Sequence, residues 1–348
     1  MRICVAYDCL YPYTVGGAER WYRAVAQRLA DAGHDVTFVT LRQWPRDVEP
    51  ELPGVRVVAV APRMQLYTDS GRRRILPPIA FGVGTLRHFL FGPRYDVVHM
   101  ASFPYFSVLA AAVARPLRGF ALVIDWHEVW TRAYWDDYLG PLGRVGSAVQ
   151  LLCARVAHRA FCFSRLHAQR LRDEGFRGEL TILEGQYEPH SHPPPQPAER
   201  IRPVAVFAGR HIPEKRAPAV VRAVKAALPD WPELRCELYG DGPERGEVER
   251  LIGELGLQDV VSTPGFVGAD ELQEALSRAT CMVLPSSREG YGRIVIEAAA
   301  VGTPSVVVAA ADNAAVELID EGVNGFIAPS AEPSDLAAAM LRVRDGGQ

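Results

Sequence analysis

Short apolar runs alternate with stretches of helical periodicity from the N-terminus onward. Residues 3–7 are apolar and bounded by turn residues, which predicts a buried strand. A helix is predicted over residues 19–32, with Trp21, Val25, Leu29 and Ala32 on its apolar side and Gly33 ending it. Further strands are predicted over 36–41, 55–60, 96–100 and 121–124. Strands apolar on both faces that alternate with helices favour a mostly parallel sheet covered on both sides.

This alternation stops at residues 190–197 and then begins again. Four prolines within residues 193–197 exclude a helix or a central strand and predict an interdomain linker. Beyond it, strands are predicted over 204–208, 235–239, 260–261, 281–284 and 305–308, and helices over 217–227, 244–255, 269–279, 295–301 and 334–343. The fold class is therefore α/β, with two doubly wound, Rossmann-like parallel-sheet domains over 1–189 and 200–348, joined by a linker at 190–199. Ligands of such sheets bind at the carboxyl ends of the strands, so we expect the site in a cleft between the domains.

Composition and charge exclude several classes of protein. With 48% hydrophobic and 23% charged residues, the chain is neither disordered nor fibrous. A net charge of −3 gives generic nucleic-acid binding no support, although residues 1–190 carry +5 and residues 191–348 carry −8. The six cysteines form no C-x-x-C pair and predict reduced, buried thiols rather than a metal site. With no apparent signal peptide and no apolar run of 18 residues, we expect a cytoplasmic protein, at most peripheral at a membrane.

The strongest local signal is the segment 286–298, which follows a predicted strand and opens a helix. Gly290 and Gly292 allow close backbone approach, and the free N–H groups of the helix start form an anion pocket. If the segment were all helix, Glu289 and Glu297 would lie about 12 Å apart along its axis, too far to act as a glycosidase pair. They could instead hold the two ends of a long polar ligand such as a nucleotide-sugar. A solvated helix start with a surface glutamate at each end would explain the same spacing.

Three further turns at predicted strand ends offer candidate ligand groups. Arg210 and Lys215 follow residues 204–208 and can converge on one anion, although a basic surface loop is common. Gly240 and Gly242 follow residues 235–239, and with Phe266 and Val267 they could line a nucleoside pocket. Gly-Asp-Gly is also an ordinary turn sequence.

The first domain offers weaker candidates. Gly16 and Gly17 could approach a phosphate or sugar, but they do not complete the G-x-G-x-x-G dinucleotide fingerprint. His127 follows residues 121–124 between acidic neighbours and is equally compatible with a structural or a catalytic role. The aromatic residues after this strand could stack on sugar rings or simply pack a helix: Trp126, Trp130, Tyr134, Trp135 and Tyr138.

The basic cluster at residues 72–74 precedes an apolar stretch at 75–90. Attachment to an anionic membrane is one interpretation. A solvated helix whose apolar face packs on the sheet is the other, and we favour it.

Taken together and in order, these motifs resemble the family 4 glycosyltransferases, which are retaining nucleotide-sugar transferases of the GT-B fold. The resemblance covers nearly the whole chain. It rests on Gly16-Gly17-Ala18-Glu19, the His127 turn, Gly209-Arg210 with Lys215, Gly240-Asp241-Gly242-Pro243-Glu244, Glu289-x7-Glu297, Ala298-Ala299-Ala300-Val301-Gly302-Thr303-Pro304 and Gly322-Val323-Asn324-Gly325-Phe326.

The resemblance implies a role for each matching residue. Arg210 and Lys215 would hold the diphosphate, Glu297 the ribose hydroxyls and Glu289 the transferred sugar, which His127 would approach from the acceptor-side domain, 1–189. The donor would lie in the domain 200–348. The remaining contacts to the donor would come from Gly16, Gly17, Gly209, Gly240, Gly242, Phe266, Val267, Gly290, Tyr291, Gly292 and Arg293.

The resemblance also implies the reaction. A UDP-, GDP- or dTDP-sugar would donate its sugar, with retention and without a metal or other cofactor, to a hydroxyl of a glycan, a lipid-linked acceptor or a natural product. A nucleotide-sugar epimerase of similar fold and a non-catalytic nucleotide-sugar-binding subunit are the alternatives. Two features depart from the family pattern. The chain ends at Gln348, where the family usually continues into another helix, and Arg293 stands where an apolar residue is common.

Overall fold

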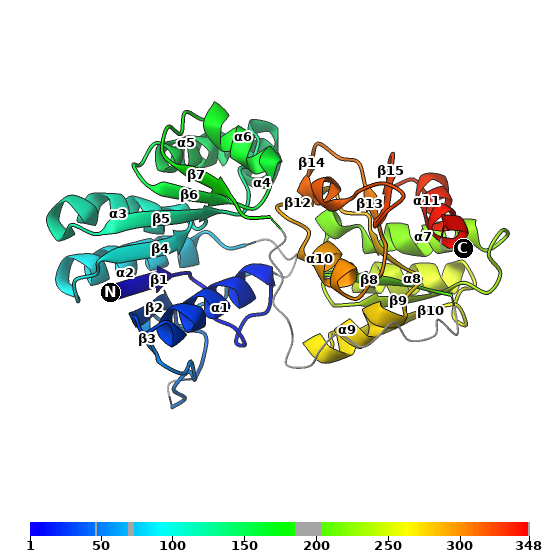
Figure 1. Cartoon of the computed structure of the whole chain (residues 1–348), viewed down its shortest axis with the longest axis horizontal. Coiled ribbons are helices and arrows are strands. Elements are labelled where there is room, and N and C mark those ends of the chain that lie inside the picture. The colour runs from blue at the N-terminus through cyan, green and yellow to red at the C-terminus, as the bar shows by residue number, and fades with distance from the viewer. Residues whose placement is uncertain (46, 69–72, 185–202, 347–348) are drawn as a thin grey trace. The chain divides into compact units, whose positions relative to one another are not determined.

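A computed structural model describes residues 1–45, 47–68, 73–184 and 203–346 and divides them into two compact units, one within residues 1–183 and one within residues 184–346 (Figure 1). Each unit is an α/β domain built on a parallel sheet, which confirms the predicted fold class. The predicted linker at 190–199 lies outside the described residues, so its bounds stay a prediction.

The first unit contains a seven-stranded sheet of order β3-β2-β1-β4-β5-β6-β7, in which every neighbouring pair is parallel. Its strands are β1 (Arg2–Ala6), β2 (Asp35–Leu41), β3 (Val55–Ala61), β4 (Val97–Ala101), β5 (Ala121–Trp126), β6 (Arg159–Cys162) and β7 (Leu180–Ile182). Its helices are α1 (Gly17–Asp31), α2 (Leu76–Phe91), α3 (Tyr105–Arg118), α4 (Arg132–Leu139), α5 (Gly143–Ala154) and α6 (Arg165–Asp173), with a 3-10 turn, η1 (Gly140–Leu142).

Helix α1 forms where the periodicity predicts it, but its buried side is turned by one position. The fully buried residues are Glu19, Tyr22 and Ala26. Trp21, Val25 and Leu29 pack at the margin of the core as predicted, whereas Ala32 is exposed beyond the helix end. The prediction missed Tyr22, whose ring is buried and stacks on Tyr7 with ring centroids 4.7 Å apart.

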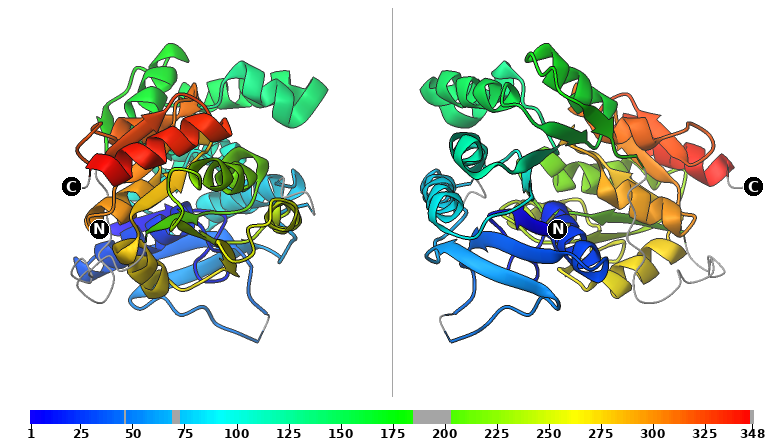
Figure 2. Two further views of the ribbon diagram at one scale, coloured as in Figure 1. Left: turned by 90° about the vertical axis from the view of Figure 1, so that its right-hand side faces the viewer. Right: turned by 60° about the vertical axis from the view of Figure 1, so that its left-hand side comes forward.

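The second unit has a six-stranded parallel sheet of order β10-β9-β8-β11-β13-β15 and a two-stranded sheet, β12-β14. The strands are β8 (Val204–Ala208), β9 (Arg235–Tyr239), β10 (Val261–Gly265), β11 (Cys281–Leu284), β12 (Arg288–Glu289), β13 (Ser305–Val308), β14 (Asp312–Asn313) and β15 (Gly325–Ala328). The helices are α7 (Ala217–Ala227), α8 (Arg245–Glu254), α9 (Ala269–Arg278), α10 (Arg293–Ala300) and α11 (Pro333–Gly346), with 3-10 turns η2 (Pro213–Lys215) and η3 (Ala314–Leu318). Helix α11 packs on α7 and β15 (Figure 2).

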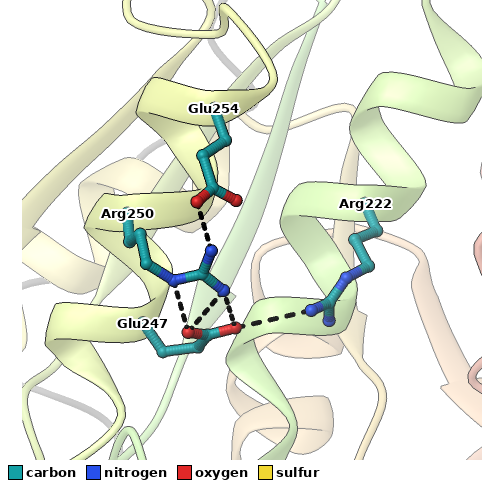
Figure 3. A network of polar contacts seen from close by, with 4 residues as sticks. All are labelled: Arg222, Glu247, Arg250 and Glu254. Atoms are coloured by element: carbon teal, nitrogen blue, oxygen red, sulfur yellow. Dashed lines mark hydrogen bonds and ion pairs between the residues drawn. The ribbon is translucent and has the colours of Figure 1, made fainter.

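A surface ion-pair network connects α7 to α8 (Figure 3). On α8, Arg250 pairs with Glu247, at 2.7 Å, and with Glu254. Glu247 also pairs with Arg222 of α7, at 3.5 Å. The side chains of all four residues are between 38% and 55% exposed, so water screens these pairs and they add little to the stability of the fold.

The six cysteines are all free and buried, which confirms the prediction of reduced thiols. Burial raises the pKa of Cys153 and Cys162 to about 12. Both side chains therefore stay protonated at neutral pH and serve as small apolar groups in the core.

One glycine at the carboxyl edge of the second sheet permits a very close backbone approach. Gly240 has φ +114°, and a Cβ there would lie 1.9 Å from the carbonyl oxygen of Gly209. Its N–H donates to the Gly265 carbonyl at 2.7 Å, and Gly209 N–H donates to the Tyr239 carbonyl at 3.1 Å. The loops that follow β8, β9 and β10 are thereby held together.

We expect Gly240→Ala to destabilise the second unit by roughly 2–5 kcal/mol, because it combines a backbone clash with a left-handed φ. Gly246→Ala is the matched control, since a Cβ at Gly246 meets nothing within 4 Å, and this helical substitution should be neutral or stabilise by up to about 1 kcal/mol. Chemical denaturation of the two variants measures the difference. Equal stability of the two would contradict the close approach.

His158 makes the stability of the first unit dependent on pH. The ring is 7% exposed, its Nε2 accepts from Trp126 Nε1 at 3.0 Å and its Nδ1 contacts the Val156 carbonyl at 2.6 Å. Burial lowers the pKa of His158 to about 4, below the ordinary value of about 6.5. The fold favours the neutral ring, so this stabilisation is complete above pH 6.5 and is lost as the pH falls through 4.

We therefore expect this histidine to account for roughly 3 kcal/mol of unfolding free energy lost between pH 6.5 and pH 4. His158→Gln, which keeps a donor and an acceptor but does not titrate there, should show a shallower pH dependence by that amount in urea unfolding. His34→Gln, at a half-exposed position, is the control and should follow the unsubstituted protein. Parallel pH profiles for all three proteins would refute the assignment.

Candidate functional site

The turn η2 and the loop before α10 are joined into one rigid element in the second unit. Ser287 donates to the Glu214 carbonyl through its N–H at 2.8 Å and through its Oγ at 3.3 Å. Arg288 lies 3.9 Å from the Glu214 carboxylate, and Lys215 pairs with Glu289. These four contacts join residues 214–215 to residues 287–289. They thereby fix the distance between the two candidate ligand groups, Lys215 and Glu289.

Glu289 lies in a short strand and not in the helix that the spacing argument assumed. It belongs to β12, pairs in register with Asn313 of β14 and is 8% exposed. Asn313 in turn donates to the carbonyls of Ser286, at 3.2 Å, and Val308, at 2.8 Å. The all-helix separation from Glu297 is therefore wrong, and Glu289 is not a surface residue, because its carboxylate reaches inward to Lys215 Nζ.

Glu297 stands one turn into α10 and pairs with the first residue of that helix. Arg293 Nε donates to Glu297 Oε1 at 3.0 Å, and both side chains are largely buried. Gly292, the residue before the helix, has φ +86°, and a Cβ there would lie 2.6 Å from the Cβ of Ala315. Gly292 therefore adopts a left-handed conformation, and Arg293 lies beside Glu297.

The remaining candidates of the second unit lie around the carboxyl edge of its sheet. Gly209 and Arg210 follow β8, and Arg210 is exposed there, whereas Lys215 turns to Glu289. Gly240 and Gly242 follow β9, with Gly242 at φ +154°. Phe266, which is 63% exposed, and Val267 follow β10. Gly290 and Tyr291 precede α10.

In the first unit, His127 follows β5 and is half-buried. Its ring stacks on Phe163, with centroids 4.4 Å apart, and meets the edge of Tyr22 at 5.7 Å. Among the described residues its Nε2 has no hydrogen-bond partner. Burial lowers the pKa of His127, opposed by Asp125 and Glu128, so the neutral imidazole predominates at pH 7. Packing thus fixes the orientation of the ring and leaves Nε2 buried without a partner among the described residues.

Two buried carboxylates at the same edge were not assigned a role from the sequence. Asp125 meets His99 Nε2 at 2.7 Å and accepts from Trp21 Nε1 at 2.8 Å. Burial alone would raise the pKa of Asp125, but His99 and the hydrogen bonds hold it below its ordinary value. Asp8, fully buried after β1, pairs with Arg73. An acidic residue directly after an apolar strand was the signal that could have singled out both.

The pairing with Asp8 also corrects one interpretation of the basic cluster at 72–74. Arg73 does not lie in solvent: its side chain is 11% exposed and its guanidinium lies 5.3 Å from the Phe103 ring centroid. Arg74 is exposed, and Arg72 lies outside the described residues. Helix α2 buries Phe81 and Phe89 against the sheet, as the favoured interpretation expects, but leaves other apolar side chains outside.

Gly16 and Gly17 open α1 at the carboxyl end of β1. Gly16 is extended at φ −175°, and a Cβ on it would lie 2.4 Å from Glu19 Oε2, so the buried Glu19 carboxylate folds back over the glycine. A carboxylate in the first helical turn stabilises the helix start. A larger residue at position 16 would displace the Glu19 carboxylate from the helix start.

The chain matches two family descriptions, one in each unit. Residues 15–184 match "Glycosyltransferase Family 4", and residues 192–347 match "Glycosyl transferases group 1". A D-inositol 3-phosphate glycosyltransferase of Streptosporangium roseum is 30% identical over 94% of this chain and 80% of its own length. Other matches are partial: with the same-named enzyme of Streptomyces griseus, 35% identity spans 151 residues, or 32% of that relative.

Solved structures show the same fold at low sequence identity. Sucrose-phosphate synthase from Thermosynechococcus elongatus aligns over 99% of this chain and 90% of its own, with a TM-score of 0.77 and 21% identity. HepE of Anabaena, in complex with UDP and glucose, aligns over 98% and 89%, with a TM-score of 0.70 and 19% identity. Both domain matches and the near full-length relative agree with the residue pattern, and the chain belongs to the family 4 glycosyltransferases.

Proposed function

We propose that the protein transfers a sugar from a nucleoside-diphosphate sugar to a hydroxyl acceptor with retention of anomeric configuration. The observation that supports this proposal is the Lys215–Glu289 pair, because a cation that could bind phosphate contacts a carboxylate that could accept from sugar hydroxyls. Arg210 on the preceding loop adds a second cation, and α10 directs its N-terminal N–H groups to the same edge. The HepE structure with UDP and glucose makes a uridine nucleotide the first donor to test.

In the proposed reaction, the acceptor oxygen bonds to the anomeric carbon as the bond from that carbon to the diphosphate breaks. The departing phosphate oxygen takes the acceptor proton, so no protein nucleophile is needed. Lys215 and Arg210 would neutralise the charge that develops on the diphosphate, and preorganised charges are effective because they need not reorient during the reaction. Glu297 would accept from the ribose, Glu289 from the sugar, and His127 would contact the sugar.

An epimerase and a non-catalytic binding subunit are the alternatives. An epimerase would convert the nucleotide-sugar with no acceptor present, which NMR of the donor would show. A binding subunit would be stabilised by the nucleotide-sugar and turn nothing over. The buried Glu289, which lies next to Lys215, favours a site that engages both phosphate and sugar.

The donor site is tested first by thermal unfolding with UDP, GDP, ADP, CMP and dTDP. A ligand at about 100 times its Kd should stabilise the folded state by about 2.7 kcal/mol. Lys215→Ala should abolish the shift and lower transfer at least tenfold. Lys225→Ala, which replaces the other lysine of the chain at an exposed site on α7, should change neither. Full activity of Lys215→Ala would remove this lysine from the mechanism.

Glu289→Ala should separate nucleotide binding from transfer. Without Glu289, Lys215 loses its ion-pair partner, so free nucleoside diphosphate should bind at least as tightly, while transfer should fall at least tenfold because the sugar loses a hydrogen-bond acceptor. Isothermal titration and initial rates measure the two effects. A parallel loss of both would mean that Glu289 only supports the fold of the loop.

We also propose that the outer face of α2 and α3 contacts an anionic membrane. The helices pack on one another, and their outward side chains include Leu76, Val83, Phe91, Val113 and Leu117, each between 61% and 82% exposed. Three arginines within residues 73–118 are exposed, Arg74, Arg87 and Arg94, and Asp96 is the single acidic residue of that segment. A basic, apolar face is complementary to anionic lipid. None of the described helices is long and apolar enough to cross a membrane.

Co-sedimentation with vesicles containing phosphatidylglycerol tests this face. Val83→Asp with Phe91→Asp should reduce binding at least fivefold, because the two charges are placed where the helices would meet lipid. Val323→Asp is the control, since that valine is 77% exposed but lies in the second unit. Unchanged sedimentation of the double variant, or none with the unsubstituted protein, would reject the membrane contact.

A further inference from the structure

The aromatic residues that follow β5 separate into two groups. Trp126 and Trp135 are 0% and 4% exposed and belong to the core. Trp130, Tyr134 and Tyr138 are partly buried. Trp130 also packs against the core, but part of each of these three rings stays accessible, so core packing alone does not account for them.

With Phe103, which follows β4, these three residues form a cluster of contacting rings that we call the aromatic shelf (Phe103, Trp130, Tyr134, Tyr138). The Trp130 centroid lies 4.7 Å from Tyr134, 5.1 Å from Tyr138 and 5.9 Å from Phe103, and the two tyrosine rings stack at 5.9 Å. The shelf joins two loops and helix α4, so its shape depends on the fold and not on one segment.

Hydrogen bonds hold the shelf in place. Tyr138 Oη accepts from the backbone N–H of Arg73 at 3.0 Å, and Trp130 Nε1 donates to Glu128 at 2.7 Å. The backbone N–H of Trp130 donates to Gln150 at 3.0 Å. A ligand would meet rings that are already oriented, and little side-chain freedom would be lost on binding.

The position of the shelf is also that of a ligand site. Phe103 and Trp130 follow adjacent parallel strands, β4 and β5, so both lie at the carboxyl edge of the sheet. His127, with its unpartnered Nε2, precedes Trp130 by three residues. The shelf therefore belongs to the same edge as the histidine proposed to contact the transferred sugar.

We infer that the aromatic shelf is the acceptor subsite and that it binds a pyranose ring of a glycan acceptor. The C–H face of a sugar ring would stack on the exposed aromatic rings, while its hydroxyls would reach the polar tips of the tyrosines and the Glu128 carboxylate, which can accept several hydrogen bonds. This inference rests on the proposed transferase function, because it assigns the acceptor class of that same site.

Saturation-transfer NMR with methyl α-D-glucopyranoside, methyl α-D-galactopyranoside and methyl α-D-mannopyranoside tests binding directly, with and without UDP, GDP and dTDP. We expect transfer to at least one methyl glycoside in the unsubstituted protein, loss of it in Tyr134→Ala and retention in the matched variant Tyr134→Phe. In turnover assays, Tyr134→Ala should raise the KM for that glycoside at least fivefold. The kcat and the donor KM should stay within twofold.

The outcomes separate the shelf from the donor site. Absence of saturation transfer from every methyl glycoside, or an acceptor KM unchanged by Tyr134→Ala, overturns the shelf. Acceptance of p-nitrophenol in place of the glycosides overturns the sugar class and indicates a flat aglycone. If Tyr134→Ala loses glycoside binding while the unsubstituted protein transfers no sugar from any nucleotide-sugar, the shelf stands and the proposed function fails.

Discussion

Parallel pairing of the strands is the constraint on which the rest of each unit depends. Every neighbouring pair in the seven-stranded and six-stranded sheets is parallel, so all carboxyl ends in a unit meet at one edge. The chain leaves the ladder at that edge, and its loops supply the polar groups that the buried strands cannot carry. Asp8 and His127 reach the edge of the first unit in this way, as Lys215 and the glycine turns do in the second, whereas Asp125 lies near the carboxyl end of β5 itself.

Each of the carboxylates at these edges contacts a basic side chain from a distant segment of the chain, which helps the fold tolerate it there. Asp8 meets Arg73 across 65 positions, Asp125 meets His99 across 26 and Glu289 meets Lys215 across 74. Removing one partner would leave an uncompensated buried charge, which is strongly destabilising. The pairs therefore bind loops together as well as presenting charge, and the rigidity of the site follows from its electrostatics.

Much of the fold, and less of the site, could be predicted from the sequence. The strands 204–208, 235–239, 281–284 and 305–308 have the predicted bounds, because apolar runs between turn residues leave little choice. Strands β6, β7 and β15 were not predicted, since they have at most four residues and are partly exposed. The sequence singles out Glu289 as a candidate ligand, which stays a prediction, but not its strand conformation, because a two-residue strand depends on pairing with β14, which no local pattern encodes.

Pairing within the candidate donor site has a consequence for selectivity under the proposed function. While Lys215 and Glu289 face one another, neither is an unpaired charge in a half-buried environment. A diphosphate that draws Lys215 away leaves Glu289 without its cation, which is costly unless sugar hydroxyls donate to it. A complete nucleotide-sugar satisfies both groups, whereas a nucleoside diphosphate satisfies only the lysine. Under the proposed function, the pair would thus favour the donor over the product that remains after transfer.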